Sequence, residues 1–302
     1  MKEMKKTSSD RFQMNSRQRT EIQAYGFLSP TILLIAIFLL SPMVTGLIMS
    51  LFKTSLSGET SFVGLRNYWL LLTEGRFLTN MKLSLFYVCG NVLFSLPLAY
   101  VLAVIITKQI RGATFLRGIF LLPWVVAPIV STVLFRSLVD PTFGPISLLI
   151  EKIVGHQIVL LAHPVWAMAT IVFHSVWRSL PFITLFLAAG MAMIPKEVYE
   201  AADVDGASKW DQFRLITVPL TKIQLTIVLL TITLWTLQDA ETVYAMTEGG
   251  PGYATEVIAV RLFKESFINF DLNAGAAMGV LLLIIGMIFL AAYSAVSRER
   301  WQ

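Results

Sequence analysis

The chain has 302 residues, of which 56% are hydrophobic and 14% are charged, and its mean hydropathy is +0.70. A soluble globular domain carries roughly 25% charged residues, so this composition excludes an ordinary soluble domain and indicates a surface that mostly meets lipid. The net charge of +5 does not indicate nucleic-acid binding, because Lys and Arg collect on the cytoplasmic flanks of membrane spans.

The first 24 residues are polar and basic, and the apolar run that follows begins at Phe27. A cleaved signal peptide is one interpretation of this pattern. However, the run is longer than the roughly 7–15 residues of a signal-peptide core, and no small-x-small pattern follows it. We therefore expect residues 1–24 to form a cytoplasmic tail and residues 25–302 to form a single transmembrane domain.

Six apolar segments are long enough to cross a hydrocarbon core about 30 Å thick, which takes about 20 residues of helix. Their long apolar runs favour helices over a barrel, whose strands alternate apolar and polar residues. We predict an all-α integral membrane protein with six transmembrane helices and expect Cys89, in the second of them, to be buried like a small hydrophobic residue. The segments are 25–51, 83–106, 119–135, 165–193, 223–245 and 275–294.

Most basic residues lie in alternate connections: the tail, the stretches 108–117 and 196–222, and the carboxyl terminus. Because cytoplasmic loops carry the excess of Lys and Arg, we expect both termini in the cytoplasm. The loops 62–80, 140–163 and 249–273 are then expected on the outside. The protein would be a multi-pass protein of a bacterial inner membrane.

The polar segment between the fourth and fifth predicted spans, called here the 194–219 loop, begins with helix signals. Pro195 suits the first turn of a helix, and Glu197 and Glu200 favour its positive amino-terminal end. Ala201 and Ala202 are strong helix formers with little bulk. These residues predict a short helix.

A second helix is expected directly after the first. Asp205-Gly206 is typical of a turn, and Ser208 with Asp211 has the spacing of a capping box. The loop is therefore predicted to be a helix-turn-helix on the cytoplasmic face. Its apolar side chains, such as Trp210 and Phe213, suit either a partner's groove or the lipid headgroups.

The run Glu200-Ala201-Ala202, together with Gly206, Ile216 and Pro219, closely resembles the EAA loop of binding-protein-dependent ABC importer permeases. Asp205-Gly206-Ala207 and Phe213 are similar to the carbohydrate branch of that family. Val218 replaces the usual Leu before the Pro, and Ile223 replaces a frequent second Pro; neither disturbs the predicted helix-turn-helix.

The resemblance extends over most of the chain from Tyr25. Segments 64–68 and 177–182 resemble elements of the family as a whole, and segment 247–251, with 275–277 at the start of the last span, is similar to its MalF-like and UgpA-like members. The resemblance implies a heterodimer with a second homologous permease, two ATPase subunits and an extracytoplasmic solute-binding protein. It also implies that the 194–219 loop docks on an ATPase subunit, through Glu200, Ala201, Ala202, Asp205, Gly206, Ala207, Phe213, Arg214, Ile216 and Pro219.

The motor is expected to be a separate subunit. A P-loop needs a Gly-Lys pair to hold phosphates, and the chain contains none. We therefore expect no catalytic residue and no cofactor in this chain, with ATP and magnesium bound by the partner ATPase. The histidines His156, His163 and His174 lack metal-ligand spacing, which argues against a metal site or a membrane-bound enzyme. The EAA resemblance argues against a secondary transporter.

Polar residues within the predicted spans mark a candidate substrate pathway. A charge at mid-span costs at least ~2.5 kcal/mol, so Arg178 is expected to face the bundle interior or a wet cavity, with Asp239 as a possible partner. A purely structural contact is the alternative. Thr231, Trp235, Gln238, Asp239 and Thr242 have helical spacing and predict one polar face, which suits a sugar or the partner permease. Trp177, beside Arg178, joins this candidate lining, whereas His174 is expected to be a satisfied buried residue.

The substrate class follows from the resemblance to the carbohydrate branch, which implies a sugar or oligosaccharide. Permeases for glycerol-phosphate or polyamines share the EAA loop and remain alternatives. A cationic lining would favour a phosphate ester, and an anionic lining would favour a polyamine.

Overall fold

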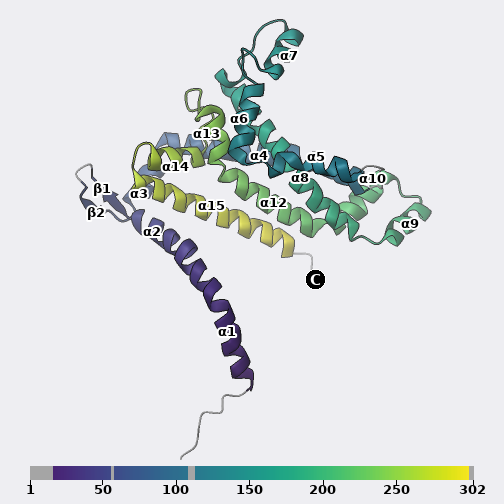
Figure 1. The fold of residues 1–302 in the computed structure, drawn as a ribbon, viewed down its shortest axis with the longest axis horizontal. Coiled ribbons are helices and arrows are strands. Elements are labelled where there is room, and N and C mark those ends of the chain that lie inside the picture. Colours follow the sequence, from purple (N-terminus) through teal and green to yellow (C-terminus); the bar gives the residue numbers. More distant parts are fainter. Residues whose placement is uncertain (1–15, 56–57, 108–112, 299–302) are drawn as a thin grey trace, which may run out of the picture.

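The computed structural model describes residues 16–55, 58–107 and 113–298, and most of them are helical (Figure 1). Most of the predicted tail lies outside the described residues. The same holds for Lys108, Arg111 and Arg300, which contributed to the expected orientation.

The amino-terminal helices form an arm that projects from the rest of the molecule (Figure 1). The arm consists of α1 (Ser16–Ile35), a π-helical turn η1 (Ala36–Leu40) and α2 (Ser41–Met49). Residues Ala24–Met49 are strongly apolar, and none of the most apolar stretch is buried against the chain. A helix that is apolar all round requires lipid or another subunit as its surroundings.

A short hairpin and a helix follow the arm at one end of the molecule. Strands β1 (Phe52–Thr54) and β2 (Thr60–Phe62) pair antiparallel, and α3 (Arg66–Thr73) follows them. Within the 64–68 segment, the Asn67 side-chain amide donates hydrogen bonds of 2.8 Å to the carbonyl oxygens of Ser50 and Phe52. This segment therefore joins the end of the arm to the bundle.

The centre of the bundle is the long contact between α4 (Gly75–Thr107) and α8 (Pro164–Ala192). Ala99 and Ala103 are fully buried there, which lets the two backbones approach closely, as small residues do in membrane proteins. Helix α12 (Lys222–Leu237) packs beside this pair, and α15 (Leu272–Arg298) packs against α12. The expectation for Cys89 was wrong, because it lies exposed on the outer face of α4, where lipid is as apolar as a protein core.

The third predicted span is two helices rather than one. Helix α5 (Ala113–Val125) ends before Ala127, and α6 (Pro128–Leu138) starts in a new direction (Figure 1). A residue that precedes proline is disfavoured in the helical region, and Ala127 has an extended ψ of 136°. Beyond α6, α7 (Pro145–Val154) and a 3₁₀ turn η2 (Leu160–Ala162) lead into α8.

The fifth predicted span is also interrupted, since α12 ends at Leu237 and α13 (Ala240–Thr247) begins after Asp239. A loop then leads to α14 (Ile258–Phe267). Within the described residues, four helices are long and apolar enough to cross a membrane, or five if the bent pair Lys209–Leu220 and Lys222–Leu237 counts as one span. The bend between those two helices is 71°.

Candidate functional site

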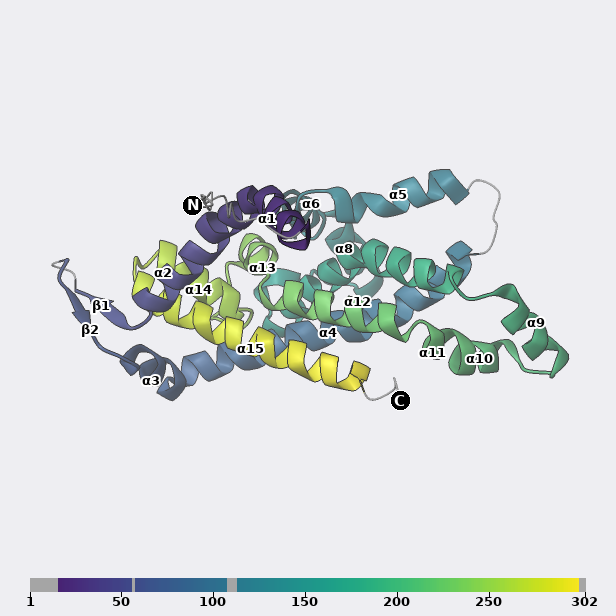
Figure 2. The same ribbon diagram turned by 90° about the horizontal axis from the view of Figure 1, so that it is seen from below.

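The 194–219 loop forms two short helices at the end of the molecule opposite to the β-hairpin (Figure 2). Helix α9 (Lys196–Val204) and helix α10 (Lys209–Gln212) flank a turn in which Gly206 has a φ of +79°. The predicted capping box is present, because Ser208 and Asp211 hydrogen-bond each other's backbone N–H groups. A π-helical turn η3 (Phe213–Thr217) and α11 (Val218–Leu220) then lead to α12.

One face of the loop is fastened to the bundle. The Phe213 ring packs edge-on against Tyr100 of α4, with 5.5 Å between ring centroids. The Tyr199 hydroxyl hydrogen-bonds that of Thr217 at 2.9 Å, which ties α9 to η3. Phe213 therefore anchors the loop to its own chain, although the family resemblance implied that it contacts a partner.

An ion pair also closes the loop on itself. The Lys209 ammonium donates to Asp203 Oδ1 at 2.7 Å, and the Gln212 amide donates to the same oxygen. The hydrogen bond from Lys209 lowers the pKa of the Asp203 carboxyl, and that from Gln212 lowers it further. The Asp203 carboxylate therefore stays charged and holds α10 beside α9.

Two large apolar side chains of the loop are exposed. Val204 is 88% exposed and Trp210 is 66% exposed, and both lie next to the small residues of the turn. Trp210 was among the apolar side chains expected to suit a partner's groove or the lipid headgroups, whereas Val204 was not predicted, because exposure of a single apolar side chain cannot be seen in a sequence. Among the predicted residues, the exposed ones are Glu200, Ala201, Asp205, Gly206, Arg214 and Pro219, and the half-buried ones are Ala202, Ala207, Phe213 and Ile216.

A polar cluster lies inside the bundle where α12 breaks. The pairing of Arg178 with Asp239 is confirmed, with 3.8 Å between Arg178 Nη2 and Asp239 Oδ2. Asp239 also accepts hydrogen bonds from the Tyr87 hydroxyl at 2.9 Å and from the Thr242 backbone N–H at 3.0 Å. Tyr87 in turn hydrogen-bonds Ser175. Asp239 therefore both caps α13 and neutralises Arg178.

Asn91 extends this polar cluster along α4. Its amide donates to the Thr236 hydroxyl at 2.8 Å, and its carbonyl oxygen accepts from Ser179 at 3.3 Å. Three helices, α4, α8 and α12, are thus joined by hydrogen bonds at the depth of the helix break. Neither Tyr87 nor Asn91 was predicted, since each stands alone in an apolar run and finds its partners on other helices.

The predicted polar face of the fifth span is not continuous. Because the helix breaks before Asp239, Thr242 is fully buried in α13, whereas Trp235 and Gln238 are exposed at the end of α12. Trp235 lies 4.9 Å from the Phe182 ring, and that ring stacks on Trp124 at 5.7 Å. The exposed groups thus form an aromatic surface beside the polar cluster.

Two residues of α8 complete this region. Trp177 is 40% exposed, and its ring lies 5.9 Å from that of His174. His174 is fully buried, with its Nε2 atom 3.3 Å from the Ser131 hydroxyl. Its Nδ1 atom has no hydrogen-bond partner in the described part of the chain. His174 is therefore buried as predicted, but only one of its two ring nitrogens is hydrogen-bonded. The described residues contain no group of three His, Cys, Asp or Glu side chains that could hold a metal.

A second charged cluster, the Glu256 cluster, lies at the hairpin end and was not predicted. It consists of Arg76, Asn80, Tyr253, Glu256 and Lys264. Glu256 is fully buried, accepts two hydrogen bonds of 3.0 Å from the Arg76 guanidinium, and lies 3.2 Å from the Lys264 ammonium. The Arg76 guanidinium also stacks on the Tyr253 ring at 4.1 Å.

The Glu256 cluster determines the shape of the 247–251 segment. Gly249 has a φ of +85°, and a Cβ at this position would lie 3.1 Å from the Glu256 side chain. The Glu256 backbone carbonyl accepts a hydrogen bond from the Asn80 amide, which fixes this loop to α4. The 247–251 segment therefore forms a loop held against a buried charge.

Replacement of Glu256 by Gln is expected to destabilise the hairpin end, because Arg76 and Lys264 then lose their common counter-charge. Removal of one partner of a buried ion pair costs about 3–5 kcal/mol. Since the Arg76 side chain is 37% exposed, we expect about 2 kcal/mol. Thermal unfolding of the purified protein measures the loss, and Glu59→Gln, at an exposed position of the hairpin, is the matched control. An unchanged midpoint for Glu256→Gln would contradict the assigned role.

Comparison with known proteins places these features in a family. Residues 84–302 match the family described as "Binding-protein-dependent transport system inner membrane component". The trehalose/maltose transport system permease protein MalF of Thermococcus litoralis is 31% identical, over 91% of this chain and 94% of that protein. The sn-glycerol-3-phosphate transport system permease protein UgpA of Agrobacterium fabrum is 30% identical, over 88% and 91%.

Solved structures share the fold. A chain from the crystal structure of a bacterial ABC transporter involved in the import of alginate superposes with a TM-score of 0.82, at 20% identity, over 94% of this chain and 98% of that chain. A chain of a bacterial alginate ABC transporter in complex with an alginate pentasaccharide-bound periplasmic protein gives a TM-score of 0.81, at 20% identity, over 93% and 96%. Both likenesses concern the arrangement of helices.

Proposed function

The chain belongs to the family of binding-protein-dependent transport system inner membrane components, and from this premise we propose that it forms half of the pathway of an ATP-driven sugar importer. It is a multi-pass membrane permease rather than a catalytic subunit. The MalF relative, named for trehalose and maltose transport, supports a sugar as the substrate. The UgpA relative is named for sn-glycerol-3-phosphate transport. Glycerol-phosphate is therefore the second candidate substrate. A polyamine is supported by no relative described above.

The 194–219 loop is the observation that carries this proposal. Its inner face is fastened to α4 through Phe213 and Tyr100, and its outer face exposes Val204 and the Gly206 turn. A movement of whatever docks on the outer face would therefore be passed to the bundle as a rigid-body motion. We assign that docking to one of two ATPase subunits, which bind ATP and magnesium, and we place the loop and both termini on the cytoplasmic side.

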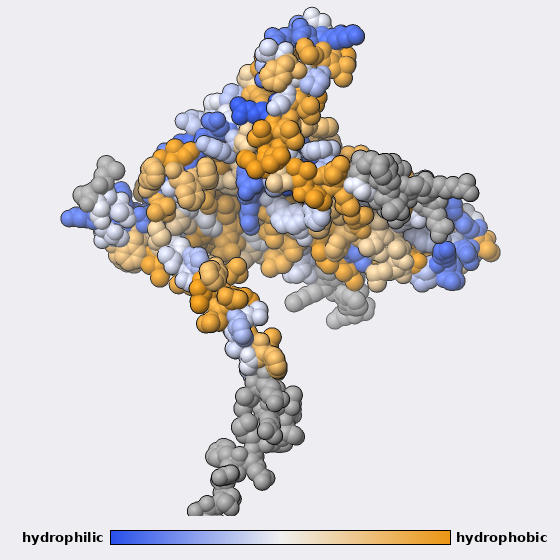
Figure 3. Space-filling model, viewed as in Figure 1, coloured by the Kyte–Doolittle hydropathy of each residue, from blue (hydrophilic) through white to orange (hydrophobic). Residues whose placement is uncertain are grey.

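The Glu256 cluster lies at the other end of the molecule, so we assign the hairpin end to the outside. A solute-binding protein would deliver the substrate there. The six-span arrangement counts α5 and α6 together as one broken span. A second homologous permease would complete the pathway, and the arm formed by α1 and α2, whose most apolar stretch is not buried in the described chain, leaves ample apolar surface for it (Figure 3).

The aromatic and polar groups at the α12 break are the proposed pathway lining. Trp177, Trp235 and Gln238 are exposed beside the Arg178–Asp239 pair. Flat aromatic faces with nearby amides suit a sugar ring, which is apolar on its faces and polar at its edges. The pair is close to neutral overall, so it favours neither a phosphate ester nor a polyamine.

Co-purification with reconstitution tests the assignment. The tagged chain is expected to bring down an ATPase subunit and a second permease, and proteoliposomes of this complex with the loaded binding protein are expected to accumulate maltose or trehalose only with ATP. Uptake of glycerol-3-phosphate without sugar uptake would select the second candidate. A chain that associates with no ATPase would contradict the proposal.

Replacement of Trp235 by Ala tests the lining. We expect the KM for sugar to rise about fivefold, since one aromatic contact contributes about 1 kcal/mol, while the chain remains stable because the side chain is 49% exposed. Gln238→Ala is expected to alter which sugars are taken up. Trp166→Ala removes an equally exposed ring, 49%, from the start of α8 and is the matched control. Unchanged specificity and unchanged rate in both lining variants would count against the pathway.

A further inference from the structure

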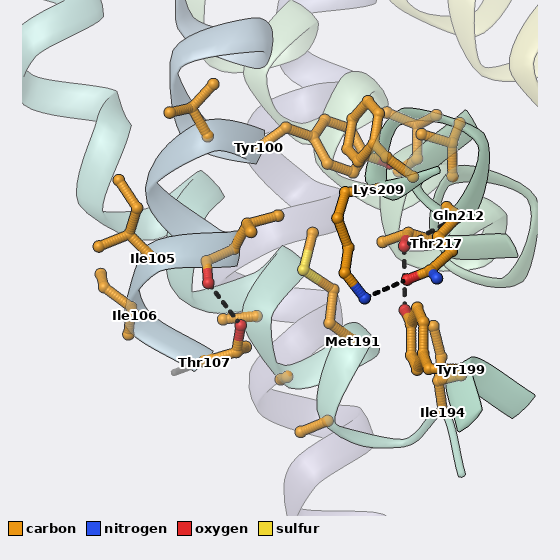
Figure 4. A pocket seen from close by; sticks show the side chains of 18 of the residues that line it. Tyr100, Ile105, Ile106, Thr107, Met191, Ile194, Tyr199, Lys209, Gln212 and Thr217 are labelled. Atoms are coloured by element: carbon orange, nitrogen blue, oxygen red, sulfur yellow. Dashed lines mark hydrogen bonds between the residues drawn. The ribbon is translucent and has the colours of Figure 1, made fainter. Parts of the chain in front are cut away.

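An apolar groove runs between α4, α8 and the 194–219 loop (Figure 4). Its volume is about 1470 Å³, and most of its walls are aliphatic or aromatic. Figure 4 shows Ile105 and Thr107 of α4 on one side and Tyr199 and Lys209 of the loop on the other. The groove could not be predicted from the sequence, because its walls come from separate parts of the chain.

The groove has the depth of one membrane leaflet. Its lining on α4 extends from Leu96 to Thr107, which is about 17 Å along a helix that rises 1.5 Å per residue. Half of a hydrocarbon core of about 30 Å is about 15 Å. Val101 and Ile105 on this wall are 59% and 45% exposed, so the groove opens sideways, toward the place of the lipid.

The loop end of the groove carries positive charge. Lys196 and Lys209 line it, and none of its lining residues is acidic. Lys196 is exposed and makes no ion pair with any described residue, while Lys209 pairs with Asp203 yet keeps a side chain that is 79% exposed. Tyr199 and Trp210 lie at the same end, as aromatic residues do where hydrocarbon meets headgroups.

We propose that this groove binds one anionic phospholipid, with an acyl chain along the groove walls of α4 and α8 and its phosphate at Lys196 and Lys209. Basic pockets between membrane helices are suited to anionic headgroups, and the aliphatic walls match an acyl chain. The lipid touches both the bundle and the loop, at Tyr100 and at Phe213, and so stabilises the contact that passes motion between them. Only the assignment to the cytoplasmic leaflet rests on the proposed function.

Lipid retention by the assembled complex tests the inference. The complex is placed in bilayers of equal phosphatidylglycerol and phosphatidylcholine, extracted, and its retained lipids are counted by native mass spectrometry. The wild type is expected to retain phosphatidylglycerol preferentially. Lys196→Gln is expected to lower that preference about fivefold, the effect of one lysine near an anionic surface. Lys152→Gln, which removes an exposed charge from α7, is expected to change nothing.

A second variant keeps the charges and fills the groove. Ala189 is exposed within it, so Ala189→Phe is expected to remove the retained phosphatidylglycerol without disturbing the core. Ala292→Phe, at an exposed position of α15, is the matched control. Equal retention by the wild type, Lys196→Gln and Ala189→Phe would overturn the inference, as would equal retention of the two lipids or a crosslink from the Ala189→Cys variant to the second permease.

Retention is measured without ATP or substrate, which separates this inference from the proposed function. A complex that retains the lipid but transports nothing would contradict the function and leave the lipid site in place. A complex that transports sugar but retains the two lipids equally would contradict the lipid site and leave the proposed function in place.

Discussion

Gly206→Asp is expected to abolish ATP-driven uptake while the chain still reaches the membrane. Gly206 has a φ of +79°, a conformation that costs other residues about 1–2 kcal/mol. An added Cβ would meet no heavy atom within 4 Å, so the substitution causes no clash inside the chain. Its effect must come from a strained turn and from a new carboxylate on the proposed docking face. Uptake into proteoliposomes and the membrane abundance of the chain are the two measurements.

Two control variants separate these causes. Gly155→Asp places the same residue at a φ of +83°, again with no heavy atom within 4 Å, but at the end of α7, and it is expected to transport normally. Gly206→Asn tolerates the left-handed conformation without adding charge, so it is expected to retain most of the activity. Normal uptake by Gly206→Asp would rule out the 194–219 loop as the lever.

Local chemistry explains why the 194–219 loop was predictable. The capping box of Ser208 and Asp211 and the turn at Gly206 depend on residues within a few positions of each other, and both are present. The direction of Phe213 was not predictable, because it is determined by Tyr100 on a different helix. Secondary structure here followed from neighbours in the chain, whereas the division into an anchored and an exposed face followed from packing.

Each of the two interrupted spans contains a residue that predicts the helix break, but an average hydropathy does not detect it. Pro128 and Asp239 each stand in an apolar run, and an average over about 20 residues passes over them. Taken singly, Pro128 disfavours helix at the preceding residue, and Asp239 followed by Thr242 is a helix amino-terminal cap. The Glu256 cluster has no such local signal, because Arg76 and Glu256 are separated by 180 residues. It could be found only from the fold.

Separate replacement of Arg178 by Gln and of Asp239 by Asn is expected to lower uptake at least about tenfold, because each leaves one charge unpaired within the membrane. Asn at position 239 still caps α13, so this variant removes the charge and keeps the helix start. The side chains are 24% and 9% exposed and 3.8 Å apart, so we expect a stability loss of about 2 kcal/mol for each, below the range of fully buried pairs. Uptake and thermal unfolding are measured on the same complexes.

The variant with both substitutions distinguishes an ion pair that is purely structural from one whose Arg178 also contacts the substrate. With both charges removed, no unpaired charge remains, and the stability of the double variant is expected to return close to that of the wild type. If the pair only holds α8 to the α12 break, uptake returns as well. If Arg178 also contacts the substrate, stability returns and uptake does not, and the KM for sugar stays raised. We expect the second result, because Arg178 remains partly exposed beside Trp177 while Asp239 is held by Tyr87 and the α13 backbone.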